Sequence, residues 1–157
     1  MGTVVGQAID YLVAQLPALA VAAQPDAMVI DGITRDELST SMIWIGRAQP
    51  EDLRAALGTR SIPTLGRRRV DETWSVDGFT DCRREGTTQK AARDAALSLF
   101  DAVAHLVGTD PSLGGLLTDA WYVTVPSAEL VQPESAITGE CRAVVLFSLD
   151  IRNRYQP

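Results

Sequence analysis

The sequence has few of the residues on which catalytic and metal sites most often depend. It contains one histidine, His105, and two cysteines, Cys82 and Cys141, which lie far apart in the chain. No Cys-x-x-Cys pair and no Cys/His spacing occurs, so neither a zinc site nor a disulfide framework is indicated. We therefore expect free thiols and no bound metal.

Nucleotide-binding and metalloprotease motifs are absent as well. The chain has no GxxxxGK[ST] loop, no GxGxxG and no HExxH, and Gly114-Gly115 follows a Pro-Ser-Leu turn instead of a strand. His105 falls on the predicted solvent side of a helix, where a Ser-His-Asp or Cys-His site would lie on an open surface. The adjacent acids Asp71 and Glu72 point to opposite faces of a strand and cannot act as a carboxylate pair. We expect no enzymatic activity and no cofactor.

Positive charge and long hydrophobic runs are also scarce. The 14 basic and 20 acidic residues give a net charge of −6, which argues against a surface built to hold DNA or anionic lipid. The most apolar early segment, residues 12–23, is short, contains Gln15 and Pro17 and lacks a basic flank. We expect neither a signal peptide nor a membrane span.

Two segments have the apolar spacing of amphipathic helices. The first begins after Thr3, which we expect to cap it, and should end near Pro17 or shortly after. The second covers residues 89–107, with Thr87 or Thr88 as its cap. Its predicted packing side consists of Ala92, Ala96, Leu99, Val103 and Leu106.

Several other segments have the pattern of strands. Two apolar runs, residues 27–30 and 41–45, are bounded by turn residues and predict buried strands. A long strand with one solvated face is predicted from Val70, and two more over about 120–130 and 139–152. We therefore expect residues 1–157 to form a single α+β domain, with a mostly antiparallel sheet and two main helices packed on it.

Two irregular stretches, residues 49–66 and 126–138, are long enough to project as arms. Within the first, residues 50–57 suggest a helical turn and residues 58–63 suggest a loop. Projecting arms often carry contacts with other molecules.

Glu72 is unusual because strand alternation places its carboxylate on the same face as Val70 and Trp74. Burying an ionised carboxylate without a partner costs several kcal/mol. We expect it to meet backbone donors or an arginine, with Arg68 and Arg142 as candidates. The alternative is that the start of this strand lies at an exposed edge of the sheet.

The order of local patterns along most of the chain resembles that of the tail terminator, or tail completion, proteins of long-tailed phages with siphovirus morphology, especially phages of actinobacteria. The resemblance begins with a helix and a strand that closes in Asp-Gly, followed by an arginine-rich run and an Ala-rich helix, and it ends in a β-hairpin. The motifs that carry it are Asp31-Gly32, Trp44-Ile45-Gly46, the Glu-x-aromatic-x-Val-x-Gly pattern of Glu72 to Gly78, and the Asp-Pro-x-Leu-Gly-Gly pattern of Asp110 to Gly115.

This resemblance implies a structural role without catalytic residues. Members of the family form a ring, usually described as a hexamer, that caps the finished tail tube, ends its polymerisation and provides the docking surface for the filled head. The implied fold is a small α/β domain. The implied partners are further copies of the chain, the tail tube protein and the head-to-tail connector protein, with DNA passing through the lumen without specific binding. The protein would then belong to the head-proximal end of the virion tail, and to the host cytoplasm during assembly.

The run Arg67-Arg68-Arg69 has three interpretations. In a ring it forms a subunit or partner interface together with Asp71 and Glu72, pairing with acids such as Asp71, Asp77 or Asp81 of the neighbouring subunit. It could instead face the lumen, although strong phosphate binding there would slow a sliding duplex. The third interpretation is a solvated loop that contacts local carboxylates. The acidic chain as a whole favours the interface over DNA binding.

Three other functions remain open from the sequence. A head-to-tail connector, or stopper, protein would share the size, the ring and the lack of catalysis. A small cytoplasmic ligand-binding domain would use Trp44, Trp74 and Trp121 to line a pocket, although tryptophans on strands are more often core or interface anchors. An enzyme would have to depend on His105.

Overall fold

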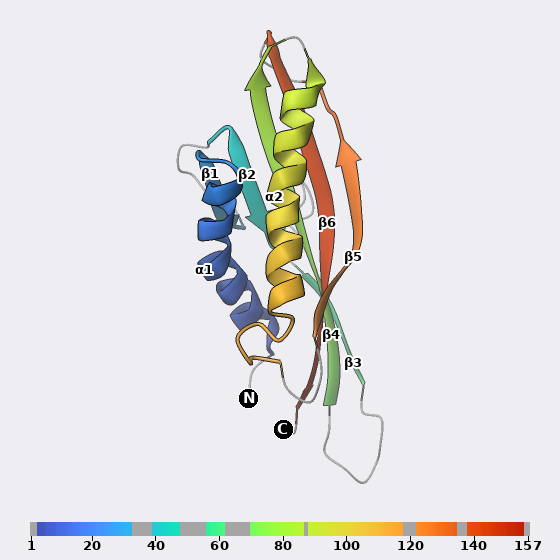
Figure 1. Cartoon of the computed structure of the whole chain (residues 1–157). Helices are drawn as coiled ribbons and strands as arrows, with labels where there is room; N and C mark the ends of the chain where they lie inside the picture. The colour runs from blue at the N-terminus through green and yellow to red at the C-terminus, as the bar shows by residue number, and fades with distance from the viewer. Residues whose placement is uncertain are drawn as a thin grey trace.

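Two helices and six strands follow one another along the chain. The computed structural model describes residues 3–32, 39–47, 56–61, 70–86, 88–117, 122–134 and 138–155. Within these ranges the elements are α1 (Val5–Ala23), β1 (Ala27–Asp31), β2 (Ser41–Ile45), β3 (Ala56–Ser61), β4 (Val70–Glu85), α2 (Gln89–Thr109), β5 (Val123–Val131) and β6 (Glu140–Tyr155). Both helices lie on one face of the sheet, and its lower end extends past them (Figure 1). The fold is α+β with a mostly antiparallel sheet, as predicted.

The two longest strands, β4 and β6, form the centre of the sheet. The strand order is β1-β2-β4-β6-β5, and only the β1–β2 pair is parallel. β6 pairs with β4 along its whole length, from Val70 to Glu85. β2 pairs with residues 78–82 of β4 and β3 pairs with residues 71–76. Because β6 occupies one side of β4, β2 and β3 must follow each other along its other side.

The main core lies between the helices and the sheet. The four residues Ala8, Leu12, Leu16 and Ala20 of α1 are fully buried there. α1 was predicted to end near Pro17 or shortly after, and it continues six residues beyond Pro17, to Ala23. Proline in a helix removes one hydrogen bond and costs about 3 kcal/mol, but burial of the apolar stripe on both sides of Pro17 offsets that cost.

The length and composition of α1 would by themselves allow it to cross a membrane. Core helices of soluble proteins pass the same test, and the buried stripe of α1 packs in the core. This property therefore does not indicate a location.

The second helix matches its prediction closely. α2 begins at Gln89 and its cap residue is Thr88, although the Thr88 side chain makes no capping hydrogen bond. Thr87 lies outside the described residues. All five residues of the predicted packing side of α2 are buried. The apolar spacing was therefore sufficient to orient this helix on the sheet.

The opposite face of the sheet is only partly solvated. A second apolar cluster forms there from Ile30, Met42, Trp44, Phe79 and Val144. Trp44 stacks on Phe79 with ring centroids 5.5 Å apart. The solvated face predicted for β4 is therefore interrupted at Phe79. The prediction that β1 is buried was wrong for most of its residues, because β1 is an edge strand in which only Ile30 is buried.

The two predicted arms contain regular structure. Residues 56–61, read from sequence as the end of a helical turn followed by a loop, form the strand β3. Much of the second stretch belongs to β5, which continues to Val131. Residues 49–55 and 62–66 lie outside the described residues, so the structure does not bear on those parts of the first arm.

Candidate functional site

The carboxylate of Glu72 is buried where the N-terminus of α1 meets β3 and β4. Glu72 as a whole is only 1% exposed. Oε1 accepts a hydrogen bond from the Val4 amide at 3.2 Å, and Oε2 accepts one from the Thr3 hydroxyl at 3.3 Å. The positive end of the helix dipole also favours an anion at this position. The Thr3 hydroxyl in turn accepts from the Val5 amide at 3.5 Å, so the predicted cap residue Thr3 and the distant Glu72 share the capping of α1.

Two side chains from the sheet complete the surroundings of Glu72. The Trp74 indole donates from Nε1 to Oε2 at 3.2 Å. Arg60 of β3 places Nε 3.5 Å from the same oxygen, with its own side chain 52% exposed. Glu72 is therefore a buried carboxylate with hydrogen-bond partners, and the alternative of an exposed strand edge does not apply. Its arginine partner is Arg60, which was not among the candidates, while Arg142 pairs with a different acid and Arg68 lies outside the described residues.

Gly58 allows Trp74 to lie across β3. The two residues are opposite each other in the β3–β4 register. A Cβ atom on Gly58 would lie 2.5 Å from two atoms of the indole ring, closer than any real packing contact. The ring thus covers the glycine of an edge strand, a known way to stabilise such strands. It also holds Nε1 toward Glu72.

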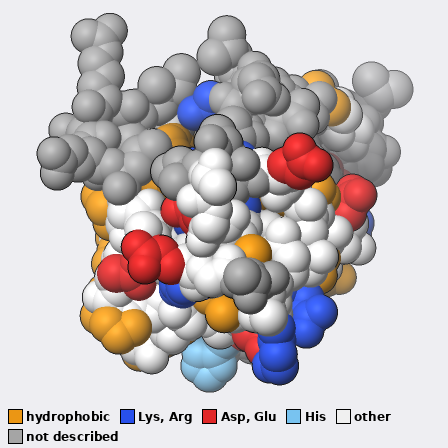
Figure 2. Space-filling view, turned by 90° about the horizontal axis from the view of Figure 1, so that it is seen from above, with side chains coloured by type: hydrophobic (Ala, Val, Ile, Leu, Met, Phe, Trp, Pro, Cys, Tyr) orange, Lys and Arg blue, Asp and Glu red, His pale blue; other side chains and the backbone are white. Residues whose placement is uncertain are grey.

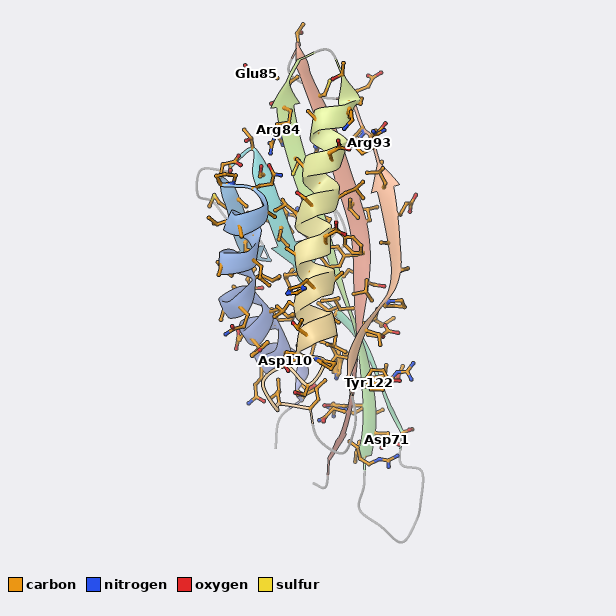
Figure 3. The ribbon with its side chains drawn as sticks, in the orientation of Figure 1. Asp71, Arg84, Glu85, Arg93, Asp110 and Tyr122 are labelled. Atoms are coloured by element: carbon orange, nitrogen blue, oxygen red, sulfur yellow. The ribbon has the colours of Figure 1, made fainter. Side chains whose placement is uncertain are left out.

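Two arginine–aspartate pairs lie on the sheet face away from the helices. Arg154 donates from Nε and Nη2 to the two carboxylate oxygens of Asp71, at 2.5 and 2.8 Å. Arg142 binds Asp81 in the same bidentate way, at 3.0 and 2.7 Å. Such two-bonded pairs are the most specific arginine–carboxylate contacts. Figure 3 shows Asp71 at the lower end of the sheet and Arg84 near the upper end of β4.

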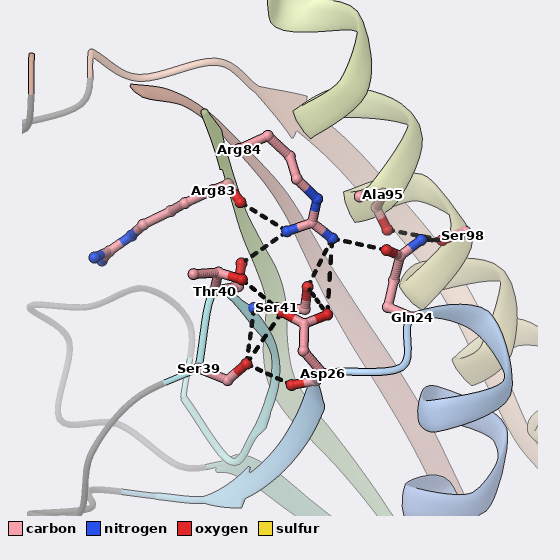
Figure 4. Close-up of polar contacts among 9 residues, drawn as sticks. All are labelled: Gln24, Asp26, Ser39, Thr40, Ser41, Arg83, Arg84, Ala95 and Ser98. Carbon is pink, nitrogen blue, oxygen red and sulfur yellow. Dashed lines mark hydrogen bonds and ion pairs between the residues drawn. The ribbon is translucent and has the colours of Figure 1, made fainter. Parts of the chain in front are cut away.

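A polar network at the upper end ties both helices to three strands (Figure 4). Arg84 donates from Nη2 to Gln24 at 2.7 Å and to the Ser41 hydroxyl at 2.8 Å. Gln24 donates in turn to Ser98 of α2. Asp26 accepts hydrogen bonds from Thr40 and Ser41, and they hold its pKa below the ordinary value despite partial burial, which acts to raise it. Every group in this network has a partner, so we interpret it as structural.

The structure describes only two of the five predicted interface residues, Asp71 and Glu72. Arg67, Arg68 and Arg69 lie outside the described residues. The structure brings Asp71 and Glu72 to the same end of β4 but on opposite faces, and gives both of them partners within the chain. Their contact with a neighbouring subunit stays a prediction. Pattern reasoning did not predict Arg60 or Arg154, because their partners become evident only from the strand register.

Within the described part of the chain, the remaining candidate residues are either exposed or engaged in packing. His105 is exposed on α2, and it is the pale blue side chain in Figure 2. Acidic and basic side chains are mixed at the end of the molecule that this view shows. Among the described residues, no group of three or more His, Cys, Asp and Glu side chains is placed to hold a metal ion. Trp44 and Trp74 are engaged in packing, and Trp121 lies outside the described residues.

The two cysteines should differ sharply in reactivity. Both are free, and Cys82 is buried whereas Cys141 is partly exposed. Burial raises the pKa of the Cys82 thiol to about 11. Because the thiolate is the reactive form, a thiol reagent should label Cys141 quickly and Cys82 only after unfolding. A Cys141→Ser control should lose the fast phase, and rapid labelling of Cys82 in the native protein would contradict its burial.

Comparison with known proteins adds no identification. No protein-family model matches the sequence, and a search of the curated proteins found no match. Any functional assignment therefore depends on this chain's own residues.

Proposed function

We propose that the chain is a structural virion protein that forms a ring, caps the phage tail tube, ends its polymerisation and provides the docking surface for the head. The ordered set of sequence motifs carries this proposal. A ring, expected to be a hexamer, would contact the tail tube protein and the head-to-tail connector, and DNA would pass through its lumen without specific binding. The protein would act at the head-proximal end of the virion tail and assemble in the host cytoplasm.

The places of these motifs in the fold support the proposal. Gly46, which closes the Trp-x-Gly motif, has φ +76° at the end of β2. Gly114 has φ +69° in the turn after α2, where its amide donates to Asp110. Glycine adopts such angles without strain. These two glycine motifs thus occupy a strand end and a turn, whereas the Glu72 to Gly78 motif lies within β4, and we propose that all of them determine shape instead of forming an active site.

The charge distribution is compatible with a DNA conduit. Arg142 and Arg154 lie on the sheet face away from the helices, and each is neutralised by a bidentate aspartate. Arginines held in this way attract phosphate less than unpaired ones, since binding a phosphate would cost the existing ion pair. We accordingly propose that the protein has neither a catalytic nor a DNA-gripping role.

Infected-cell lysates that lack the protein provide the decisive test. A terminator predicts overlong tail tubes, because nothing ends their polymerisation. Tails of normal length beside heads that leak DNA would instead indicate a stopper protein on the portal side. Normal virions would contradict both.

The arginine run can be tested by substitution. Changing Arg67, Arg68 and Arg69 together to Ala should weaken ring assembly or docking on the tube, because a basic edge would lose its charge. Light scattering over a concentration series and co-sedimentation with polymerised tubes would measure the two effects. The control variant Lys90→Ala/Arg93→Ala removes exposed positive charge from α2 and should leave both unchanged. Unaltered assembly and docking in the triple variant would contradict the interface interpretation.

A further inference from the structure

The sheet has unpaired strand sides at both of its lateral edges. Within the described ranges, β5 pairs only with β6, β1 only with β2, and β3 only with β4. β1 and β3 belong to one lateral edge, and β5 forms the other. Unpaired strand sides present backbone N–H and C=O groups that can bind a further strand.

β3 has few of the features that normally protect an edge strand, and Arg60 is its only charged residue. Its pairing with β4 runs from Ala56 to Ser61 without a register shift, and it contains no proline. Leu57 on this strand is 62% exposed, the highest value among the large apolar side chains with marked exposure. Long unprotected edges with exposed apolar residues tend to pair with other chains.

β5 is protected in its first half only. Pro126 and a register shift between Thr124 and Ser127 disturb the pairing there. From Ser127 to Val131 the register is regular again. Residues 127–130 are exposed, including Leu130 at 40%. This half therefore offers a second open edge on the opposite side of the sheet.

The charges of these two edges are complementary. From residue 56 to residue 69 the sequence contains Arg60 and the three-arginine run and no acid. From residue 123 to residue 138 it contains Glu129 and Glu134 and no base. β1, the other strand on the β3 side, is flanked by Asp26 and ends at Asp31, so it would repel Glu129. Charge therefore favours β3 over β1 as the partner of β5.

The strand directions also permit this pairing. β3 is antiparallel to β4, β4 to β6, and β6 to β5. β3 and β5 consequently run in opposite directions within one chain. In a head-to-tail ring all copies have the same orientation about the ring axis, so β3 of one copy beside β5 of the next forms an antiparallel pair.

We propose that β3 of one copy pairs with residues 127–131 of β5 in the next copy, so that the sheets of neighbouring subunits are continuous around the ring. This inference rests on the proposed ring. The basic strand β3, with Arg60, then lies beside the acidic second half of β5, with Glu129, in the neighbour. Asp71 and Asp81 keep their partners within the chain.

Two edge variants test this contact, each blocking one side only. Leu57→Glu places an acid on the β3 edge, where it would repel Glu129 of the neighbour, and Glu129→Lys reverses the charge on the β5 edge. Both positions are exposed, so folding should be retained. Val21→Lys on α1, also exposed, is the matched control away from either edge. Multi-angle light scattering gives the mass of each protein alone and of the mixed edge variants.

The expected masses are distinct. Wild type and Val21→Lys form rings, and each edge variant alone is a monomer. An equimolar mixture of Leu57→Glu and Glu129→Lys forms rings again, because each altered edge can then pair with an edge of opposite charge. Hydrogen exchange should slow at residues 56–61 and 127–131 on ring formation, and not at 27–31.

Several results would overturn the inference. Rings formed by either edge variant, a mixture that stays monomeric, or a wild type monomeric at every concentration would each do so. Dimerisation of one variant alone would indicate pairing of identical edges instead. The proposed function is tested separately, by the length of the tails in infected-cell lysates that lack the protein.

Discussion

Glu72→Gln should destabilise the fold by about 2–4 kcal/mol, because an amide replaces an acceptor that buried donors require. Three groups donate to the carboxylate: the Val4 amide, the Thr3 hydroxyl and the Trp74 indole. The glutamine side chain would turn its own N–H₂ toward some of them, and the N-terminus of α1 would lose a negative charge. Urea unfolding at neutral pH, followed by tryptophan fluorescence, would measure the change.

Arg60→Gln is the matched control for this site. Arg60 is half exposed and its nitrogen is 3.5 Å from Glu72, so its loss should cost less than about 1 kcal/mol. The contrast would show that the helix terminus and the indole, more than the ion pair, stabilise the buried carboxylate. A Glu72→Gln variant as stable as wild type would contradict this account, and so would an Arg60→Gln variant that is equally destabilised.

Gly78→Ala should cost about 3 kcal/mol, the upper end of the usual range for overpacking a core. A Cβ atom at this position would lie 2.7 Å from two ring atoms of Phe147 and 2.7 Å from the backbone oxygen of Trp44. The Phe147 ring has some freedom to move, but the Trp44 oxygen belongs to the β2 backbone, which is paired with β4. Relief of this contact therefore requires the two strands to separate.

Two further variants make this prediction specific. Gly108→Ala places its Cβ in open space on α2 and should stabilise the protein by about 0.4–1 kcal/mol by restricting the unfolded chain. Adding Phe147→Leu to Gly78→Ala should recover only part of the loss, since the contact with the Trp44 oxygen remains. Thermal unfolding would compare all three, and full recovery in the double variant would show that only the ring was in conflict.

Local patterns predicted the elements whose periodicity is long and regular. The spacing of Ala92, Ala96 and Leu99 oriented α2, because one face of a helix must meet the core. The alternation from Cys141 to Ile151 predicted β6, whose face toward the helices is apolar. Asp-Gly and Gly-Gly pairs predicted turns, because glycine adopts positive φ angles readily.

Short or weakly patterned segments could not be predicted in this way. β3 has the sequence Ala-Leu-Gly-Thr-Arg-Ser, which lacks strand character. It is a strand because the lower half of β4 extends beyond β2 and offers a free side with the Trp74 ring over Gly58. In the same way α1 continues past Pro17 because Ala20 is buried in the core and Leu19 and Ala23 pack against it.

The sequence by itself determined the fold class, the two helices, the central strands and the lack of recognisable catalytic motifs, since all of these depend on residue type and spacing. Only the tertiary structure decided which charges meet. Glu72 is 68 residues from Val4, and Asp71 is 83 residues from Arg154. Strand register and helix placement brought these groups together, and a pattern of neighbouring residues contains no information about such distant partners.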